Sequence, residues 1–236
     1  MMNQNKKITI ILVSDIKLNK SLEALLISSK KIQPFESLFF TSKEINLSKK
    51  NSELIKIIKI EPINSLRSYS EFIIYSLHKY IKTSHILIVQ WDGYIINSKK
   101  WDSRFLDFDY IGAPFIPREY DINYSKNKDG KFFSIGNGGF SLRSKKLLEM
   151  PSKFRLKDEK EITNFHEDGF FSVLHREFFE SKGMHWAPYS IAKEFSIETP
   201  LSISDFKMNT FGFHGKKMYI LNFIKKFFGY FTYKID

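Results

Sequence analysis

The chain has 236 residues, 42% of them hydrophobic, and no Gly/Ser/Pro-rich linker divides it, so we expect one folded domain with a C-terminal appendage. The absence of cysteine excludes disulfide scaffolds, thiolate zinc sites and cysteine nucleophiles, and it fits a reducing compartment such as the cytoplasm. The formal net charge of +11 favours an anionic partner, but the lysines are scattered from Lys6 to Lys234, so we expect no nucleic-acid binding.

The first half of the chain alternates strand-like with helix-like segments. Strands are predicted at 8–13, 38–41, 55–60 and 86–89, and helices from Ser21, as N-cap residue, and over 68–81. This alternation predicts a mostly parallel sheet covered by helices on both faces. No GxGxxG or GxxxxGKS/T motif follows the first strand, so neither a Rossmann dinucleotide site nor a P-loop is predicted.

The fourth predicted strand delivers a carboxylate to its end. The chain there reads Gln90-Trp91-Asp92-Gly93, and the glycine places nothing bulky beside the carboxylate. Ligands of open α/β sheets bind outside the carboxyl ends of the strands, so Asp92 is a candidate to hold a cation or a polar ligand. The alternative is an ordinary turn aspartate, because Asp-Gly is a common turn pair.

A glycine-rich segment follows further along the chain. A short strand at 109–115 and a polar loop at 118–131, which we expect to be exposed and able to act as a lid, precede Asn137-Gly138-Gly139. Glycines allow close approach of a ligand to the backbone, so these amides are candidates to face a sugar or a phosphate. The alternative is a tight turn before the helix predicted at 145–150.

Two later segments carry side chains that suit catalysis or binding. Glu167 and Asp168 begin a predicted helix, where a carboxylate is a candidate general base or simply a first-turn acid favoured by the helix dipole. The phenylalanines beside these acids would raise a carboxyl pKa. His214 stands between Phe and Gly residues and is a candidate ligand or an ordinary packed histidine.

In their order along the chain, five blocks together resemble a bacterial DUF5672-type family, which is similar to GT-A glycosyltransferases. The blocks are 89–93, 109–114, 136–143, 166–168 and 213–215. The resemblance implies a nucleotide-sugar-dependent transferase with a GT-A-like α/β/α sandwich around a mostly parallel central sheet. We expect this domain to span residues 1–216 and a C-terminal amphipathic segment to span residues 217–236.

The resemblance also implies roles for single residues. Asp92 and His214 match metal ligands, and Glu167 and Asp168 match the acidic pair that supplies the catalytic base. The residues expected to bind donor or acceptor are Trp91, Gly93, Asn137, Gly138, Gly139, Arg143 and Lys216. The implied cofactor is a divalent cation, Mn²⁺ or Mg²⁺.

One position departs from the family pattern. Gln90 stands where a DxD motif has its other acid. Without a metal, a basic side chain would have to neutralise the diphosphate leaving group. The candidates for that task are Arg67, Lys79, Arg143 and Lys216.

These predictions describe a glycosyltransferase that moves a sugar from a nucleotide-diphosphate donor, with a UDP-sugar favoured, to a glycan or lipid-linked acceptor in surface polysaccharide synthesis. Asp168 would be the base of an inverting displacement, and Glu167 would orient hydroxyl groups. The alternatives are a non-catalytic glycan-binding module and a metal-dependent nuclease.

The C-terminal segment interleaves aromatic residues with lysines over 218–231 and is too interrupted to span a bilayer. Its composition fits an interfacial helix on an anionic membrane surface, and packing onto its own domain is the alternative. We therefore expect a cytoplasmic protein with a contact at the inner face of the plasma membrane.

Overall fold

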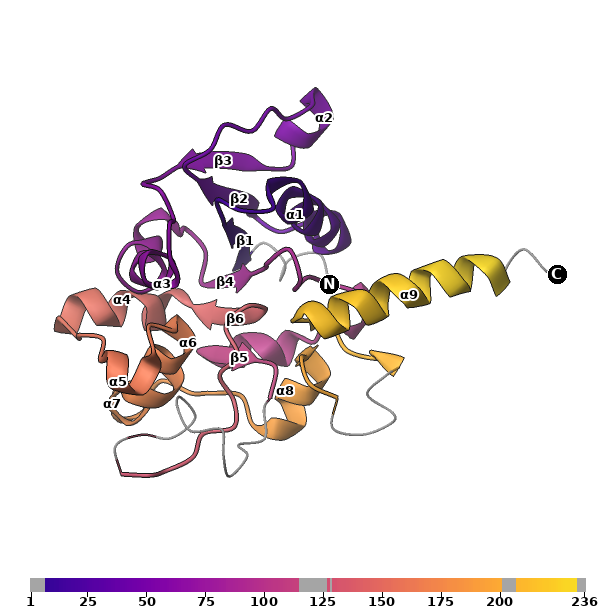
Figure 1. Cartoon of the computed structure of the whole chain (residues 1–236). Coiled ribbons are helices and arrows are strands. Elements are labelled where there is room, and N and C mark those ends of the chain that lie inside the picture. The colour runs from indigo at the N-terminus through magenta and orange to yellow at the C-terminus, as the bar shows by residue number, and fades with distance from the viewer. Residues whose placement is uncertain (1–6, 115–126, 128, 201–206, 233–236) are drawn as a thin grey trace.

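The computed structural model describes residues 7–114, 127, 129–200 and 207–232, and its centre is a six-stranded sheet in the order β3-β2-β1-β4-β6-β5 (Figure 1). The strands are β1 (Ile8–Val13), β2 (Glu36–Thr41), β3 (Lys56–Lys59), β4 (His85–Ile88), β5 (Tyr110–Gly112) and β6 (Ser141–Ser144). The first four strands run parallel, and β6 is antiparallel to both β4 and β5. The predicted α/β class with a mostly parallel central sheet is confirmed.

The helices cover both sides of this sheet. They are α1 (Leu18–Ile32), α2 (Lys49–Ser52), α3 (Leu66–Tyr75), α4 (Lys145–Phe154), α5 (Lys160–Thr163), α6 (Glu167–Gly169), α7 (Arg176–Ser181), α8 (Tyr189–Phe195) and α9 (Lys216–Thr232). Helix α1 contacts β1 and β2 on one side of the strand column, whereas α3 and α4 lie together on the other side (Figure 1). A π-helical turn, Phe170–Leu174, joins α6 to α7.

The central strands are continuous apolar runs because both of their faces are covered. Every residue of β1 and of β4 is buried, which fits parallel strands between two helix layers. Strand β6 was not predicted, since its sequence Ser-Leu-Arg-Ser has no apolar run. Its arginine and serines are nevertheless buried, and each has hydrogen-bond partners inside the protein.

The predicted bounds of two helices were wrong. Helix α1 begins at Leu18, with Lys17 as its N-cap residue, and Ser21 is buried inside the helix rather than capping it. Leu18 packs against the core together with Leu22, which extends the helix upstream of the serine. The helix predicted over 68–81 begins at Leu66 after a Ser65/Ser68 capping box, ends at Tyr75, and is followed by a separate 3₁₀ turn.

A small parallel sheet of β7 (Ser196–Ile197) and β8 (Gly212–Phe213) completes the fold, and α9 starts three residues after it ends. The predicted loop at 118–131 lies mostly outside the described residues. Within the described ranges, we find no helix that combines the length and the apolar character needed to cross a membrane.

The strand order creates a ligand-binding position at the centre of the sheet. From β1 the chain moves outward through β2 to β3 and then crosses back to place β4 on the other side of β1. Ligands of open α/β sheets bind at such a reversal, outside the carboxyl ends of the two central strands. A ligand site is therefore expected at the residues that follow β1 and β4.

Candidate functional site

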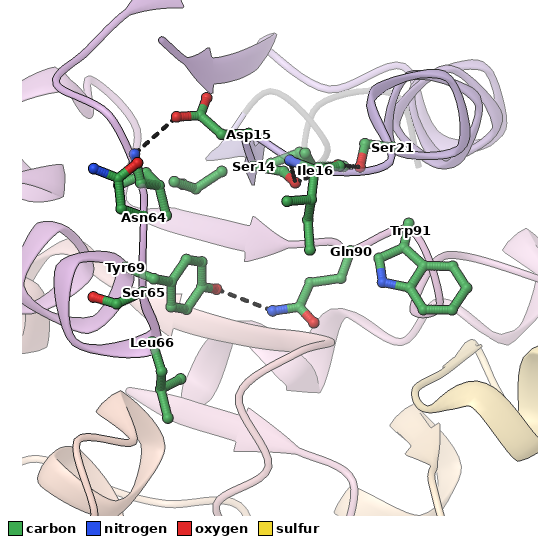
Figure 2. Close-up of a pocket in the computed structure, with 13 residues that line it drawn as sticks. Ser14, Asp15, Ile16, Ser21, Asn64, Ser65, Leu66, Tyr69, Gln90 and Trp91 are labelled. Atoms are coloured by element: carbon green, nitrogen blue, oxygen red, sulfur yellow. Dashed lines mark hydrogen bonds between the residues drawn. The ribbon is translucent and has the colours of Figure 1, made fainter. Parts of the chain in front are cut away.

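A cavity of about 350 Å³ opens at the carboxyl ends of β1 and β4. The end of β1, the start of α3 and the turn after β4 provide its wall, through Leu12, Val13, Ser14, Asp15, Ile16, Ser21, Ile63, Asn64, Ser65, Leu66, Tyr69, Gln90 and Trp91. Most of the surface inside is apolar. Figure 2 shows Gln90 pointing across the cavity, where its Nε2 donates to the Tyr69 hydroxyl at 3.1 Å.

Asp15 holds the rim of this cavity in place. Its carboxylate accepts hydrogen bonds from the Thr41 and Ser42 hydroxyls at 2.6 Å each, and from the backbone N–H groups of Ser42 at 2.7 Å and Ile63 at 2.8 Å. Burial favours the neutral acid, but the hydrogen bonds outweigh it and lower the pKa of Asp15 to about 2. Sequence reasoning missed Asp15, although it follows β1 as Asp92 follows β4.

The turn after β4 is tight and places Asp92 beside several cations. Gln90 and Gly93 exchange backbone hydrogen bonds of 2.8 and 3.0 Å, and the Asp92 carbonyl accepts from the Gly215 N–H at 2.9 Å. Asp92 is buried, and its burial raises the pKa of its carboxyl, while the charges of His214, Lys17 and Lys216 oppose that rise. Asp92 is thus a turn residue and a carboxylate close to three basic side chains.

His214 lies at the centre of a polar cluster. In its protonated form the ring donates through Nδ1 to Glu198 Oε1 at 2.8 Å and through Nε2 to Gln90 Oε1 at 3.2 Å. Burial disfavours this cation, but the Glu198 hydrogen bond and the negative charges of Glu198, Asp92 and Asp168 outweigh it and raise the pKa of His214. Sequence reasoning missed Glu198, because it follows a strand of only two residues, too short to show a periodic pattern.

Two glycines make room for the imidazole. A Cβ atom on Gly139 would lie 2.0 Å from His214 Nε2, and one on Gly93 would lie 2.9 Å from His214 Cδ2. The glycine-rich segment therefore does more than turn the chain, since any side chain at residue 139 would occupy the position of the ring.

Asn137 joins the same cluster. Its Nδ2 donates to Glu198 Oε2 at 2.8 Å. Its Oδ1 is buried and has no hydrogen-bond partner among the described residues. A buried amide oxygen without a partner is costly, so this atom is suited to accept from a ligand hydroxyl or to contact a cation.

Asp168 also contacts the glycine-rich segment. Its carboxylate accepts from the N–H groups of Gly138 at 3.1 Å and Gly169 at 2.9 Å. Burial and the neighbouring charge of Glu167 raise the pKa of Asp168 well above the usual range for aspartate. The structure thus brings Asp168 together with the backbone that also borders His214.

Arg143 and Glu167 lie beneath the site as a buried ion pair. Their side chains are 0% and 5% exposed and meet at 2.7 Å between Arg143 Nη1 and Glu167 Oε2. Arg143 also donates to the Tyr110 hydroxyl, and a Cβ atom on Gly138 would lie 2.3 Å from Glu167 Oε1. The guanidinium is enclosed by protein, so its contacts are with residues that support the site.

The remaining basic candidates are exposed, and they differ in the residues that lie near them. Arg67 is exposed and pairs with Glu71, and Lys79 is exposed in the 3₁₀ turn before β4. Lys216 is exposed at the start of α9, near Asp92. Lys17, which sequence reasoning missed, has its Nζ atom 3.4 Å from the centroid of the Trp91 ring.

Trp91 sits between the cavity and α9. Its ring lies 5.4 Å from that of Tyr219, and Lys20 approaches both rings, at 5.6 and 5.4 Å. The indole therefore forms part of the cavity wall on one side and packs against α9 on the other.

The described residues contain no group of three or more His, Asp and Glu side chains placed to hold a metal ion. Asp92 and His214 are of the right chemical types, since Mg²⁺ and Mn²⁺ prefer carboxylate oxygens and Mn²⁺ also accepts imidazole. In many metal sites the histidine ligand donates its other ring N–H to a carboxylate, as His214 Nδ1 does to Glu198 here. Two protein ligands suffice where substrate phosphates and water complete the coordination.

Comparison with known proteins finds a family that matches most of the chain. The family described as "Protein of unknown function (DUF5672)" matches residues 53–214, more than half of the chain. That stretch includes Asp92, Asp168, Glu198 and His214, but not the β1 end of the cavity. No curated protein shows significant similarity to the chain.

Several solved structures have a backbone fold similar to that of the chain, and two of them are glycosyltransferases by name. One is a mannosyltransferase from Pyrobaculum calidifontis in complex with GDP-Man and Mn²⁺, with a TM-score of 0.40, 10% identity and coverage of 61% of this chain. The chain spans only 46% of that protein. The other is a glycosyltransferase involved in glycosylation of the major capsid of PBCV-1, with a TM-score of 0.49, 14% identity and coverage of 88% of this chain and 91% of that chain.

Proposed function

The chain belongs to the DUF5672 family, and we propose that it is a glycosyltransferase that moves a sugar from a nucleotide-diphosphate donor to a hydroxyl group of a glycan or lipid-linked acceptor. The observation that carries the proposal is the place of His214, which interacts with the charges of Asp92 and Asp168 and is hydrogen-bonded at 3.2 Å to Gln90, a residue of the cavity wall at the reversal point of the sheet. The resemblance of the sequence blocks to GT-A glycosyltransferases agrees with it.

In this proposal the cavity receives the nucleoside of the donor. Its volume of about 350 Å³ lies at the lower end of the usual range for small-molecule sites, roughly 300–1,000 Å³. Leu66 and Trp91 offer apolar surface to a base, and Ser14, Asn64 and Gln90 offer polar groups to a ribose. We favour a UDP-sugar as donor.

The diphosphate would lie near Asp92, where the basic side chains gather. Asp92 and His214 would hold a divalent cation, Mn²⁺ or Mg²⁺, after His214 loses a proton and its Nε2 gives up the bond to Gln90, with Glu198 orienting the imidazole through Nδ1. When bound, the cation neutralises negative charge on the departing diphosphate. Lys17 and Lys216 act in the same direction by attracting the phosphates.

Asp168 would take the proton from the acceptor hydroxyl. Its raised pKa suits a general base that works near neutral pH. As the acceptor O–H bond breaks, the acceptor oxygen bonds to the anomeric carbon, and the bond from that carbon to the diphosphate oxygen breaks with its electron pair. This single displacement inverts the anomeric configuration. Glu167, held by Arg143, would position the glycine-rich backbone near donor or acceptor hydroxyls.

The proposed biological setting is surface polysaccharide synthesis. The enzyme would work in the cytoplasm, at the inner face of the plasma membrane, where lipid-linked acceptors present their hydroxyl groups.

A non-catalytic glycan-binding module is the second candidate. Gln90 stands in place of an acid, and the described residues contain no group of three or more His, Asp and Glu side chains placed to hold a metal ion. Both observations favour a binding module over a nuclease. A module of this kind would bind a sugar without breaking the donor bond, so turnover separates the two functions.

Thermal unfolding with a panel of nucleotide sugars, with and without Mn²⁺, tests the proposal, because a ligand that binds the folded state raises the Tm. We expect UDP-sugars to give the largest rise, and the best donor to be slowly hydrolysed without acceptor. Absence of a rise with any nucleotide sugar would refute the proposal. A rise with glycans alone, without donor hydrolysis, would favour the binding module.

A further inference from the structure

The outward side of α9 presents large apolar side chains to solvent. Ile220, Phe223 and Ile224 are 56%, 63% and 42% exposed. Their spacing of three and four residues places them on one side of the helix. Figure 1 shows α9 running outward from the body of the protein toward the C-terminus. Exposed apolar residues grouped in this way mark a surface that binds something.

The opposite side of α9 is firmly attached to the domain. Met218 is 1% exposed, and Asn222 donates to the Tyr94 hydroxyl at 3.1 Å. Tyr219 packs against Trp91 and Tyr94, with ring centroids 5.4 and 6.4 Å apart. The helix is thus fixed by its inner side, and the apolar residues on its outer side are not needed for that attachment.

The surroundings of this face are basic. Lys216 and Lys217 are exposed in the first turn of α9, which contains no acidic residue. Lys17 and Lys20 are also exposed and lie over the Trp91 and Tyr219 rings next to that turn. The whole chain carries a formal charge of +11. A second copy of the chain would bring the same lysines together, whereas an anionic surface would be attracted by them.

We propose that the outward side of α9 binds the surface of a membrane that contains anionic lipid. An amphipathic helix of this type lies in the plane of the membrane, with apolar side chains among the acyl chains and lysines at the headgroups. In sequence the helix continues through Lys225 and Lys226 to four aromatic residues between 227 and 231, the composition of an interfacial helix.

The location of α9 has a consequence for the site. The Gly215 N–H, one residue before the helix, donates to the Asp92 carbonyl at 2.9 Å. Lipid bound to α9 would therefore hold the Asp92 and His214 cluster at a fixed place relative to the membrane, which suits a lipid-linked acceptor. This consequence rests on the proposed glycosyltransferase function, whereas the lipid contact itself does not.

Vesicle co-sedimentation tests the lipid contact without any donor or acceptor. We expect the full chain to bind vesicles of phosphatidylcholine with phosphatidylglycerol, to bind pure phosphatidylcholine vesicles far less, and to be released by salt. Combined substitution of Ile220, Phe223 and Ile224 by Ser should weaken binding by about tenfold or more. Lys217→Glu should weaken it several-fold.

The matched control replaces exposed apolar residues elsewhere. Phe35 and Leu54 are 50% and 38% exposed and lie at the amino edge of the sheet, so their substitution by Ser should leave vesicle binding unchanged. Circular dichroism and size-exclusion chromatography of each variant check folding and association state. Equal vesicle binding by the α9 triple variant and the wild type would overturn the proposal. So would a wild-type dimer that the triple variant turns into a monomer, since the face would then bind a second copy.

Discussion

Asp168 is the residue on which the proposed chemistry depends most directly, because it combines a raised pKa with a place beside the glycine-rich backbone. We expect Asp168→Asn to lower kcat by about 10²–10⁴-fold, while the Kd for the donor changes little. A base must be ionised, so the wild-type rate should fall as the pH drops through the raised pKa of Asp168. The residual rate of the variant should lack that fall.

The measurement is donor turnover across a pH series, with calorimetric titration of the donor. Asp102→Asn is the control, since Asp102 is paired with Arg104 near the surface and lies outside the cluster. Turnover of Asp168→Asn at the wild-type rate would remove Asp168 from the mechanism.

The Glu198 and His214 pair should make the stability of the fold depend on pH. Because Glu198 raises the pKa of His214, the pair stabilises the fold fully below the ordinary histidine pKa of 6.5, and this contribution disappears as the pH rises through the raised value. Glu198→Gln should therefore lower the free energy of unfolding more at acidic than at alkaline pH. Urea unfolding without added metal measures this difference in the free energy of unfolding. NMR titration should show a lower pKa of His214 in Glu198→Gln than in the wild type. An unchanged pKa would show that Glu198 does not act on the ring.

The glycine-rich turn before β6 makes room for the His214 ring. A Cβ atom on Gly139 would lie 2.0 Å from His214 Nε2, so Gly139→Ala must displace the ring. Overpacking of this kind costs about 1–3 kcal/mol, and we expect turnover per folded molecule to fall at least about tenfold. Gly183→Ala is the comparison, because its Cβ atom would meet nothing within 4 Å and only its φ of +79° is strained.

Both glycine variants should lose some stability in urea unfolding, but only Gly139→Ala should lose turnover. Equal turnover in the two variants would mean that the position of the imidazole does not matter for the reaction.

The central strands differ in whether the sequence alone could predict them. Strands β1 and β4 were predictable because burial on both faces leaves uninterrupted apolar runs, and Asp92 was found because it ends such a run. Strand β6 was not predictable, since its buried polar residues are satisfied by partners that only the fold supplies.

Three residues of the site escaped prediction for different physical reasons. Glu198 follows a two-residue strand, too short for any periodic pattern, and meets His214 only through the pairing of β7 with β8. Lys17 approaches Trp91 from an N-cap position with a left-handed backbone, φ 49°. A lysine in the sequence does not predict this conformation. Asp15 had the same signal as Asp92, an acid shortly after an apolar strand, and could have been found.

The fold assembles the candidate site from segments that lie far apart in the chain. Four segments meet at the carboxyl ends of the central strands. They are the end of β1, the turn after β4, the glycine-rich turn before β6 and the start of α9. A ligand that binds there must therefore affect all four segments together, which distinguishes this site from any local binding surface.

Hydrogen exchange tests this convergence directly. Addition of UDP with Mn²⁺ should slow amide exchange in segments 14–17, 90–93, 136–139 and 213–216, because a bound ligand suppresses local opening of every segment that holds it. Segment 52–56 lies at the amino edge of the sheet and should exchange at its unliganded rate. Protection confined to one of the four segments, or protection of 52–56 instead, would place the nucleotide outside the cluster of Asp92 and His214.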